Sequence, residues 1–75
     1  MQILIVEDDP DTLEILSELL QMQGHVIVTA SHARQALDSL QQTPADLLIT
    51  DVNLPGISGI ELAKMAKADH PDIDI

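Results

Sequence analysis

The sequence DLLITDVNLPGISG, residues 46–59, contributes most to deciding the fold of this chain. Its apolar run, Leu47 to Thr50, is short and does not alternate with polar residues, which is typical of a strand covered on both faces. The run ends at Asp51, and Pro55-Gly56 favours a loop after it. A helix with apolar residues at helical spacing is expected over residues 59–68. The stretch therefore predicts a buried strand, an acidic residue at its carboxyl end and a crossover helix.

The same pattern occurs twice in the preceding residues. Ile3 to Val6 is a first strand-like run, and leucines at helical spacing predict a helix from Pro10 to about Met22. Val26 to Thr29 is a second β-branched run. A second helix is expected to follow it, with Ser31 as its N-cap, and to end before Pro44.

The predicted order is therefore βαβαβα, and Ile73-Asp74-Ile75 has the pattern of the start of a fourth strand. Each link is long enough for a parallel crossover, and no hairpin signal is present. Right-handed crossovers then give an α/β fold with an open, doubly wound parallel sheet. We expect residues 1–75 to be one domain, incomplete because its fourth strand is barely begun.

The composition favours a small folded protein of the cytoplasm. Hydrophobic residues make up 45% of the 75 residues, without any aromatic residue or cysteine, so disulfides and thiolate metal sites are excluded. No apolar run approaches the ~18 residues that span a bilayer, and no signal peptide is recognisable. The net charge of −10 disfavours contact with nucleic acid or anionic membranes. This acidity either keeps the protein soluble or helps to hold a cation.

Acidic residues follow two of the predicted strands: Glu7, Asp8 and Asp9 the first, Asp51 the third. The carboxyl ends of parallel strands meet at one edge of a sheet, where sites form at the point of strand reversal. At ~5 Å and an effective dielectric of 20, each like-charge pair costs on the order of 3 kcal/mol. A hard cation such as Mg²⁺ would offset this cost. Asp9 is expected to cap the next helix instead, and the three histidines share no metal-ligand spacing.

Two blocks of the sequence resemble the receiver domain of two-component response regulators. They are ILIVEDDP at residues 3–10 and DLLITDVNLPGISGIEL at residues 46–62. The second block is specific, because it combines a strand, an aspartate, Leu-Pro-Gly and a further glycine that opens a helix. The likeness covers the whole chain and implies a flavodoxin-like receiver fold, truncated after the third helix.

The resemblance also implies a function and its residues. Asp51 matches the aspartate that accepts a phosphoryl group from a sensor histidine kinase or phosphotransfer protein. The family's Mg²⁺ site implies Asp8 as a direct ligand, Glu7 mostly through water, Asp51 itself and the backbone carbonyl of Asn53. Such a module is a phosphoacceptor and not an enzyme, apart from self-dephosphorylation at most. An output domain, and the hydroxyl and lysine residues that contact the phosphoryl group, would lie beyond Ile75.

Three alternatives are open on the sequence. A degenerate or truncated receiver would bind partners without being phosphorylated. A Toprim-like, Mg²⁺-dependent nucleic-acid enzyme also carries acidic residues after two strands, but here Asn53 replaces one of them and the charge repels DNA. A haloacid-dehalogenase-like phosphatase needs Asp-x-Asp, which Asp51-Val52-Asn53 does not provide.

Two surfaces are expected to be uncovered because the fourth strand is barely begun and the fifth strand and last helix of the resembled fold are absent, which would make the chain either a homo-oligomer or a loosely folded monomer. One is the outer edge of the strand at residues 47–50, whose unpaired backbone groups would allow homo-oligomers to form. The other is the apolar face of the first helix, drawn from Leu13, Leu16 and Leu20.

Overall fold

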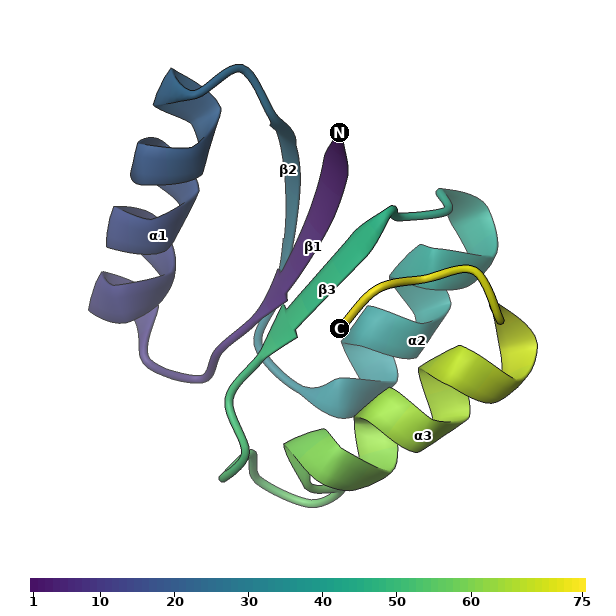
Figure 1. Cartoon of the computed structure of the whole chain (residues 1–75). Coiled ribbons are helices and arrows are strands. Elements are labelled where there is room, and N and C mark those ends of the chain that lie inside the picture. The colour runs from purple at the N-terminus through teal and green to yellow at the C-terminus, as the bar shows by residue number, and fades with distance from the viewer.

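Three strands alternate with three helices in a computed structural model that describes residues 1–75 (Figure 1). This confirms the predicted order, and the predicted bounds are correct to within one residue. The elements are β1 (Gln2–Val6), α1 (Pro10–Met22), β2 (Val26–Ala30), α2 (Ala33–Gln42), β3 (Leu47–Thr50) and α3 (Gly59–Asp69).

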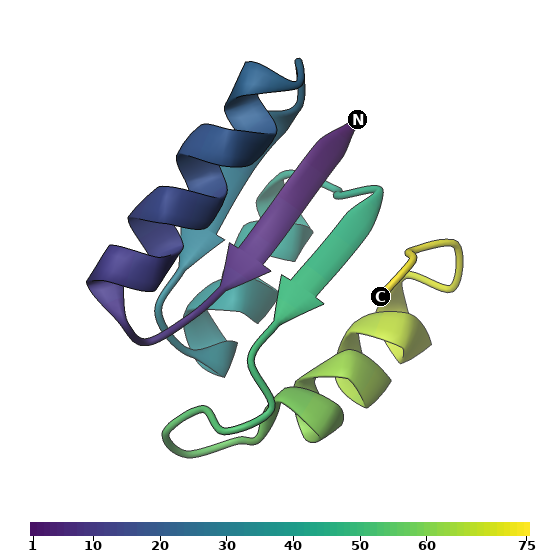
Figure 2. The same ribbon diagram turned by 60° about the vertical axis from the view of Figure 1, so that its left-hand side comes forward.

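The strands form one parallel sheet in the order β2-β1-β3. The chain moves from β1 to β2 on one side and then crosses to β3 on the other, so the strand order reverses between β1 and β3. Helix α1 covers one face of the sheet, while α2 and α3 cover the other (Figure 1). The carboxyl ends of β1 and β3 lie side by side at one edge (Figure 2). The doubly wound α/β sheet is therefore confirmed, and its switch point lies between β1 and β3.

The central strand is buried on both faces. Its residues Ile3 to Val6 are each at most 2% exposed, which fits their non-alternating apolar run. Leu4 and Val6 belong to the main core cluster, and Ile3 and Ile5 alternate with them toward the opposite face, where α1 lies. The main cluster on the α2 and α3 side contains aliphatic and alanine side chains only: Leu4, Val6, Ala30, Ala33, Ala36, Leu40, Leu48, Leu54, Leu62, Ala66 and Ile73.

Helix α1 is the least buried of the three helices. None of its residues is fully buried. Its leucines Leu13, Leu16 and Leu20 are half-buried, so the expectation that this face would be exposed is only partly right. Gly24, at a φ of +91°, follows the C-cap and donates its N–H to the Gln21 carbonyl at 3.0 Å. This left-handed conformation favours glycine and ends the helix.

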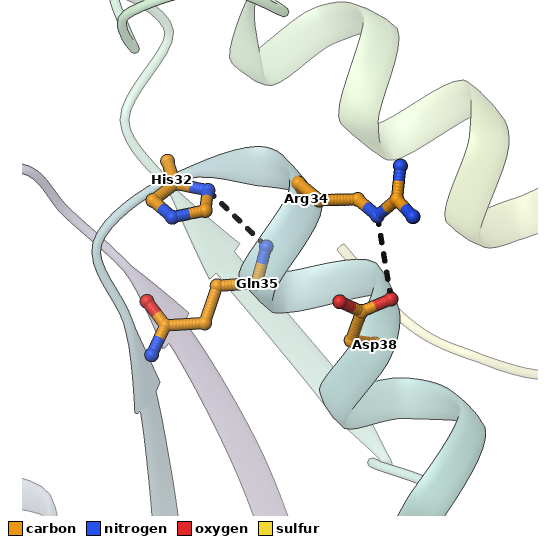
Figure 3. A network of polar contacts seen from close by, with 4 residues as sticks. All are labelled: His32, Arg34, Gln35 and Asp38. Atoms are coloured by element: carbon orange, nitrogen blue, oxygen red, sulfur yellow. Dashed lines mark hydrogen bonds and ion pairs between the residues drawn. The ribbon is translucent and has the colours of Figure 1, made fainter.

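Helix α2 is capped by His32, and the expectation that Ser31 would be its N-cap is wrong. The Nδ1 atom of His32 accepts a hydrogen bond from the Gln35 backbone N–H at 3.2 Å (Figure 3). The Ser31 N–H and hydroxyl both donate to the Gln35 side-chain oxygen, at 2.9 and 3.1 Å. The hydroxyl of Ser31 is thus used as a donor to Gln35, and the helix begins one residue later. Arg34 and Asp38 form an exposed ion pair on the same helix, at 3.5 Å (Figure 3).

The C-terminal residues pair with the start of β3, as expected for the beginning of a fourth strand. Asp74 forms an isolated parallel bridge with Leu47. The Leu48 N–H donates to the Asp74 carbonyl at 2.8 Å, and the Asp74 N–H donates to the Asp46 carbonyl at 3.0 Å. Beyond this bridge, no strand lies along the outer edge of β3. None of the three helices combines the length and the apolar character that crossing a membrane requires.

Candidate functional site

Three carboxylates meet at the switch point of the sheet. Glu7 and Asp8 follow β1, and Asp51 follows β3. Val6 pairs with Thr50 in the register of these strands, so the residues after both strands emerge at the same level. One carboxylate oxygen from each of Glu7, Asp8 and Asp51 lies within 4.8 Å of the other two. The clustering expected from the sequence is present.

Asp51 is held through both its main chain and its carboxylate, as is Glu7, whose N–H donates to the Ala30 carbonyl at 3.0 Å and whose Oε1 accepts the Asp9 N–H at 3.1 Å. For Asp51 the two contacts are as follows. Its N–H donates to the Val6 carbonyl at 3.1 Å, which extends the β1–β3 pairing by one residue. Its Oδ1 atom accepts a hydrogen bond from the Asn53 N–H at 3.3 Å. Asp51 and Glu7 are half-buried, while Asp8 is exposed. The Asp51 carboxylate is therefore held in one direction at the sheet edge.

The donor set of this cluster fits a hard divalent cation. No Lys, Arg or His forms an ion pair with Glu7, Asp8 or Asp51, since the chain's one ion pair joins Arg34 to Asp38. Carboxylate oxygens are the ligands that Mg²⁺ prefers, and it needs only one or two of them when water and a phosphate complete its shell. The Asn53 N–H donates to the Asp51 carboxylate. A ligand role for the Asn53 carbonyl stays a prediction.

The Asp9 carboxylate is not part of this cluster, although the Asp9 N–H donates to Glu7 Oε1 at 3.1 Å. It occupies the N-cap position of α1, directly before Pro10. Its Oδ2 atom accepts a hydrogen bond from the Thr12 hydroxyl at 2.6 Å, and this bond holds the pKa of Asp9 below its usual value. Since the hydrogen bond favours the charged form, Asp9 stabilises the start of the helix as a carboxylate.

The backbone of Asp51 has two further contacts. The Thr50 hydroxyl donates to the Asp51 carbonyl oxygen at 3.0 Å. Gly59, the first residue of α3, is buried and packs against the Asp51 main chain. A Cβ atom placed on Gly59 would lie 2.0 Å from the Asp51 carbonyl oxygen. A glycine at a helix start is visible in the sequence. Nothing there marks Thr50, because threonine is an ordinary strand residue.

The loop between β3 and α3 is anchored at several points. Leu54 is buried in the core cluster, and Gly56 has a φ of +80°, which favours glycine. Ser58 caps α3 by accepting a hydrogen bond from the Glu61 N–H at 3.2 Å. These contacts lead the chain back from Asp51 so that α3 begins against the Asp51 backbone.

The fold and the site together define a doubly wound α/β protein with an acidic cluster at its switch point. The chain belongs to the response regulator receiver domain family, whose family model matches residues 3–75. This identification does not favour the Toprim-like or phosphatase alternatives.

Individual relatives agree with this identification. The response regulator receiver protein CpdR of Brucella abortus is 36% identical over 99% of this chain and 62% of its own length. The phosphate regulon transcriptional regulatory protein PhoB of Pseudomonas aeruginosa is 38% identical over 97% of this chain and 32% of its own. The chain thus spans less than two thirds of the length of these curated relatives.

Solved structures are similar over nearly the whole chain. The response regulator TrrA of Thermotoga maritima, in complex with Mg²⁺-BeF, has a TM-score of 0.91 and 39% identity, covering 96% of this chain and 63% of TrrA. The complex of the histidine kinase ThkA with TrrA gives a TM-score of 0.89 at 39% identity, over 96% of this chain and 62% of the other. A flavodoxin-like receiver fold follows from these comparisons.

Proposed function

We propose that this chain is a phosphoacceptor module of a two-component signalling system, in which Asp51 accepts the phosphoryl group. The observation that carries the proposal is the position of Asp51 at the end of β3, with its carboxylate next to those of Glu7 and Asp8. Membership of the receiver family supports this assignment. The module acts as an acceptor and carries at most self-dephosphorylation, so it is not an enzyme in its own right.

The transfer uses one oxygen of Asp51 as the nucleophile. Oδ1 is engaged by the Asn53 N–H, which leaves Oδ2 without a hydrogen bond from the protein. Attack of Oδ2 on the phosphorus of a phosphohistidine forms a P–O bond and breaks the P–N bond. The electron pair goes to the imidazole nitrogen, which then takes up a proton. The product is an acyl phosphate on Asp51.

A bound Mg²⁺ fits this proposal. The similar protein TrrA was solved in complex with Mg²⁺-BeF. Asp8 and Asp51 of this chain would hold Mg²⁺ directly, Glu7 mostly through water, and the Asn53 carbonyl would complete the protein ligands. When bound, the cation would neutralise the clustered carboxylates and the charge on the phosphoryl oxygens. Placing these side chains together at one sheet edge is what the protein itself contributes.

The phosphoryl donor would be a histidine kinase or a phosphotransfer protein. A kinase partner is supported by the ThkA–TrrA complex. Helix α1 starts directly after Asp9 and carries exposed apolar side chains at i, i+4 and i+7, namely Ile15, Leu19 and Met22. A stripe with this spacing suits contact with a helix of the kinase. An output domain would belong to the longer proteins of the family, and the net charge of −10 argues against direct DNA binding by residues 1–75.

Phosphorylation with a small donor tests the proposal. The chain is incubated with acetyl phosphate and Mg²⁺, and its intact mass is measured. We expect the wild type to gain the mass of one phosphoryl group and Asp51→Asn to gain none, because the amide is not a nucleophile of this kind. Asp72→Asn is the matched control, since this exposed aspartate lies in the turn after α3, and it should be labelled like the wild type. An undiminished adduct on Asp51→Asn would refute the assignment.

A further inference from the structure

The backbone of the proposed acceptor is held at both its N–H and its carbonyl oxygen. On the β1 side, the Asp51 N–H donates to the Val6 carbonyl. On the other side, the Asp51 carbonyl oxygen accepts the Thr50 hydroxyl at 3.0 Å. The start of α3 packs against the same oxygen through Gly59. The Gly59 N–H donates to the Val52 carbonyl at 3.0 Å, which fixes the helix start against this segment.

The contact at Gly59 leaves no room for a side chain. A Cβ atom there would lie 2.0 Å from the Asp51 carbonyl oxygen, 2.9 Å from its carbon and 3.0 Å from the Val52 Cα. All three neighbours are backbone atoms, so no side-chain rotation could relieve the overlap. Either α3 or the Asp51 backbone would have to move by about 1 Å to restore a normal contact.

We propose that Thr50 and Gly59 are positioning residues that fix the Asp51 backbone, and through it the direction of the accepting carboxylate. The inference rests on the proposed function of Asp51. Both residues contact the main chain of Asp51. They act on the Asp51 carbonyl, and Asp51 has only two side-chain torsions between its backbone and Oδ2.

The need for such positioning follows from the chemistry of transfer. An in-line displacement requires the nucleophilic oxygen to approach phosphorus along a narrow direction, and an error of 1 Å can cost about a hundredfold in rate. The Asn53 N–H sets the orientation of the carboxylate relative to the loop. That contact is useful only if the Asp51 main chain is itself fixed. Thr50 suits this role because its β-branched side chain has few rotamers.

Thr50→Val tests the hydroxyl, because valine has nearly the same shape without the hydrogen bond. We expect the maximal rate of labelling by acetyl phosphate to fall about fivefold, the effect of one neutral hydrogen bond. The donor concentration for half-maximal rate should be unchanged, and the melting temperature should fall only by about 4–8 °C, the cost of one hydrogen bond in a domain of this size. Thr50→Ser should restore the rate, and Thr29→Val is the matched control on the strand farthest from Asp51. A second readout is hydrogen exchange at the Gly59 amide. Exchange should be faster than in the wild type for Thr50→Val, and unchanged for Thr50→Ser and Thr29→Val.

Gly59→Ala tests the close approach. We expect the labelling rate to fall by up to about a hundredfold, the value reached if the Asp51 carbonyl takes up the whole displacement of about 1 Å. If Gly59→Ala does not fold, the Thr50 variants still test whether the Asp51 backbone must be held in position. Labelling of Thr50→Val at the rate of Thr29→Val, or failure of Thr50→Ser to restore the rate, would overturn the positioning role. An unlabelled wild type would instead refute the proposed function, and the exchange measurement would still show whether Thr50 fixes the Gly59 contact.

Discussion

The position of the Asp51 carboxylate brings a like-charge repulsion with it when no cation is bound. In the proposed site this carboxylate lies beside those of Glu7 and Asp8, with oxygens within 4.8 Å of one another. Three negative charges at this distance repel one another. Asp8 is exposed, so solvent weakens this repulsion to about 1 kcal/mol per pair. The acidic cluster therefore lowers the stability of the chain locally, and a bound cation would offset this loss.

This conflict gives a prediction at the scale of the residue. Asp51→Asn should raise the stability of the metal-free chain by about 2 kcal/mol, because it removes two like-charge pairs, with Glu7 and with Asp8, at about 1 kcal/mol each. Mg²⁺ at tenfold excess over its Kd should stabilise the wild type by about 1.4 kcal/mol and the variant by less. Thermal melts followed by circular dichroism, with and without Mg²⁺, measure both effects. A wild type whose melting does not respond to millimolar Mg²⁺ would contradict the metal site, and Asp72→Asn controls for the loss of any single charge.

The sequence predicts some of these residues and not others, for physical reasons. Glu7, Asp8 and Asp51 could be placed together because strand ends in a parallel sheet share one edge. His32 could not be predicted as a cap, because the choice between it and Ser31 depends on where the Gln35 side chain lies. The role of Thr50 depends on the direction of a hydroxyl, which only the folded chain defines.

At the scale of the element, the three helices differ in how much they contribute to the core. Helix α3 buries Leu62 completely, whereas α1 has no fully buried residue and lies alone on its face of the sheet. The bounds of the helices were predictable because apolar periodicity and caps act locally. The unequal burial was not, since it depends on which elements share a face.

This difference gives a second prediction. Leu62→Ala should destabilise the chain by about 2–5 kcal/mol, the range for a buried leucine, and Leu16→Ala by about half as much or less. Both substitutions remove the same atoms from a helix, so each is the matched control of the other. Urea denaturation followed by circular dichroism gives the two free energies of unfolding. Equal losses would show that α1 is packed as well as α3.

At the scale of the whole molecule, an open sheet edge and a large negative charge oppose each other. Asp74 pairs only with the start of β3, so the rest of that outer edge has no strand beside it and could pair with a second copy. The net charge of −10 repels such a copy at low ionic strength. Association through this edge should therefore depend on salt.

Sedimentation equilibrium measures this dependence. We expect the chain to be more monomeric at about 0.01 M salt, where the Debye length is about 30 Å, than at about 1 M, where it is about 3 Å. Asp74→Pro removes the N–H that bonds the Asp46 carbonyl, so it uncovers more of the edge and should increase association. A molecular mass that is the same at both salt concentrations and in both chains would rule out pairing at β3.

The purely aliphatic core has an optical consequence. With no tryptophan, tyrosine or phenylalanine, the folded protein is nearly transparent in the near ultraviolet and has no intrinsic fluorescence. A single tryptophan introduced by Val52→Trp, at an exposed position next to Asp51, would be the sole emitter in the molecule. Every change in its emission would then report on the surroundings of the loop between β3 and α3, with no background signal from the rest of the chain.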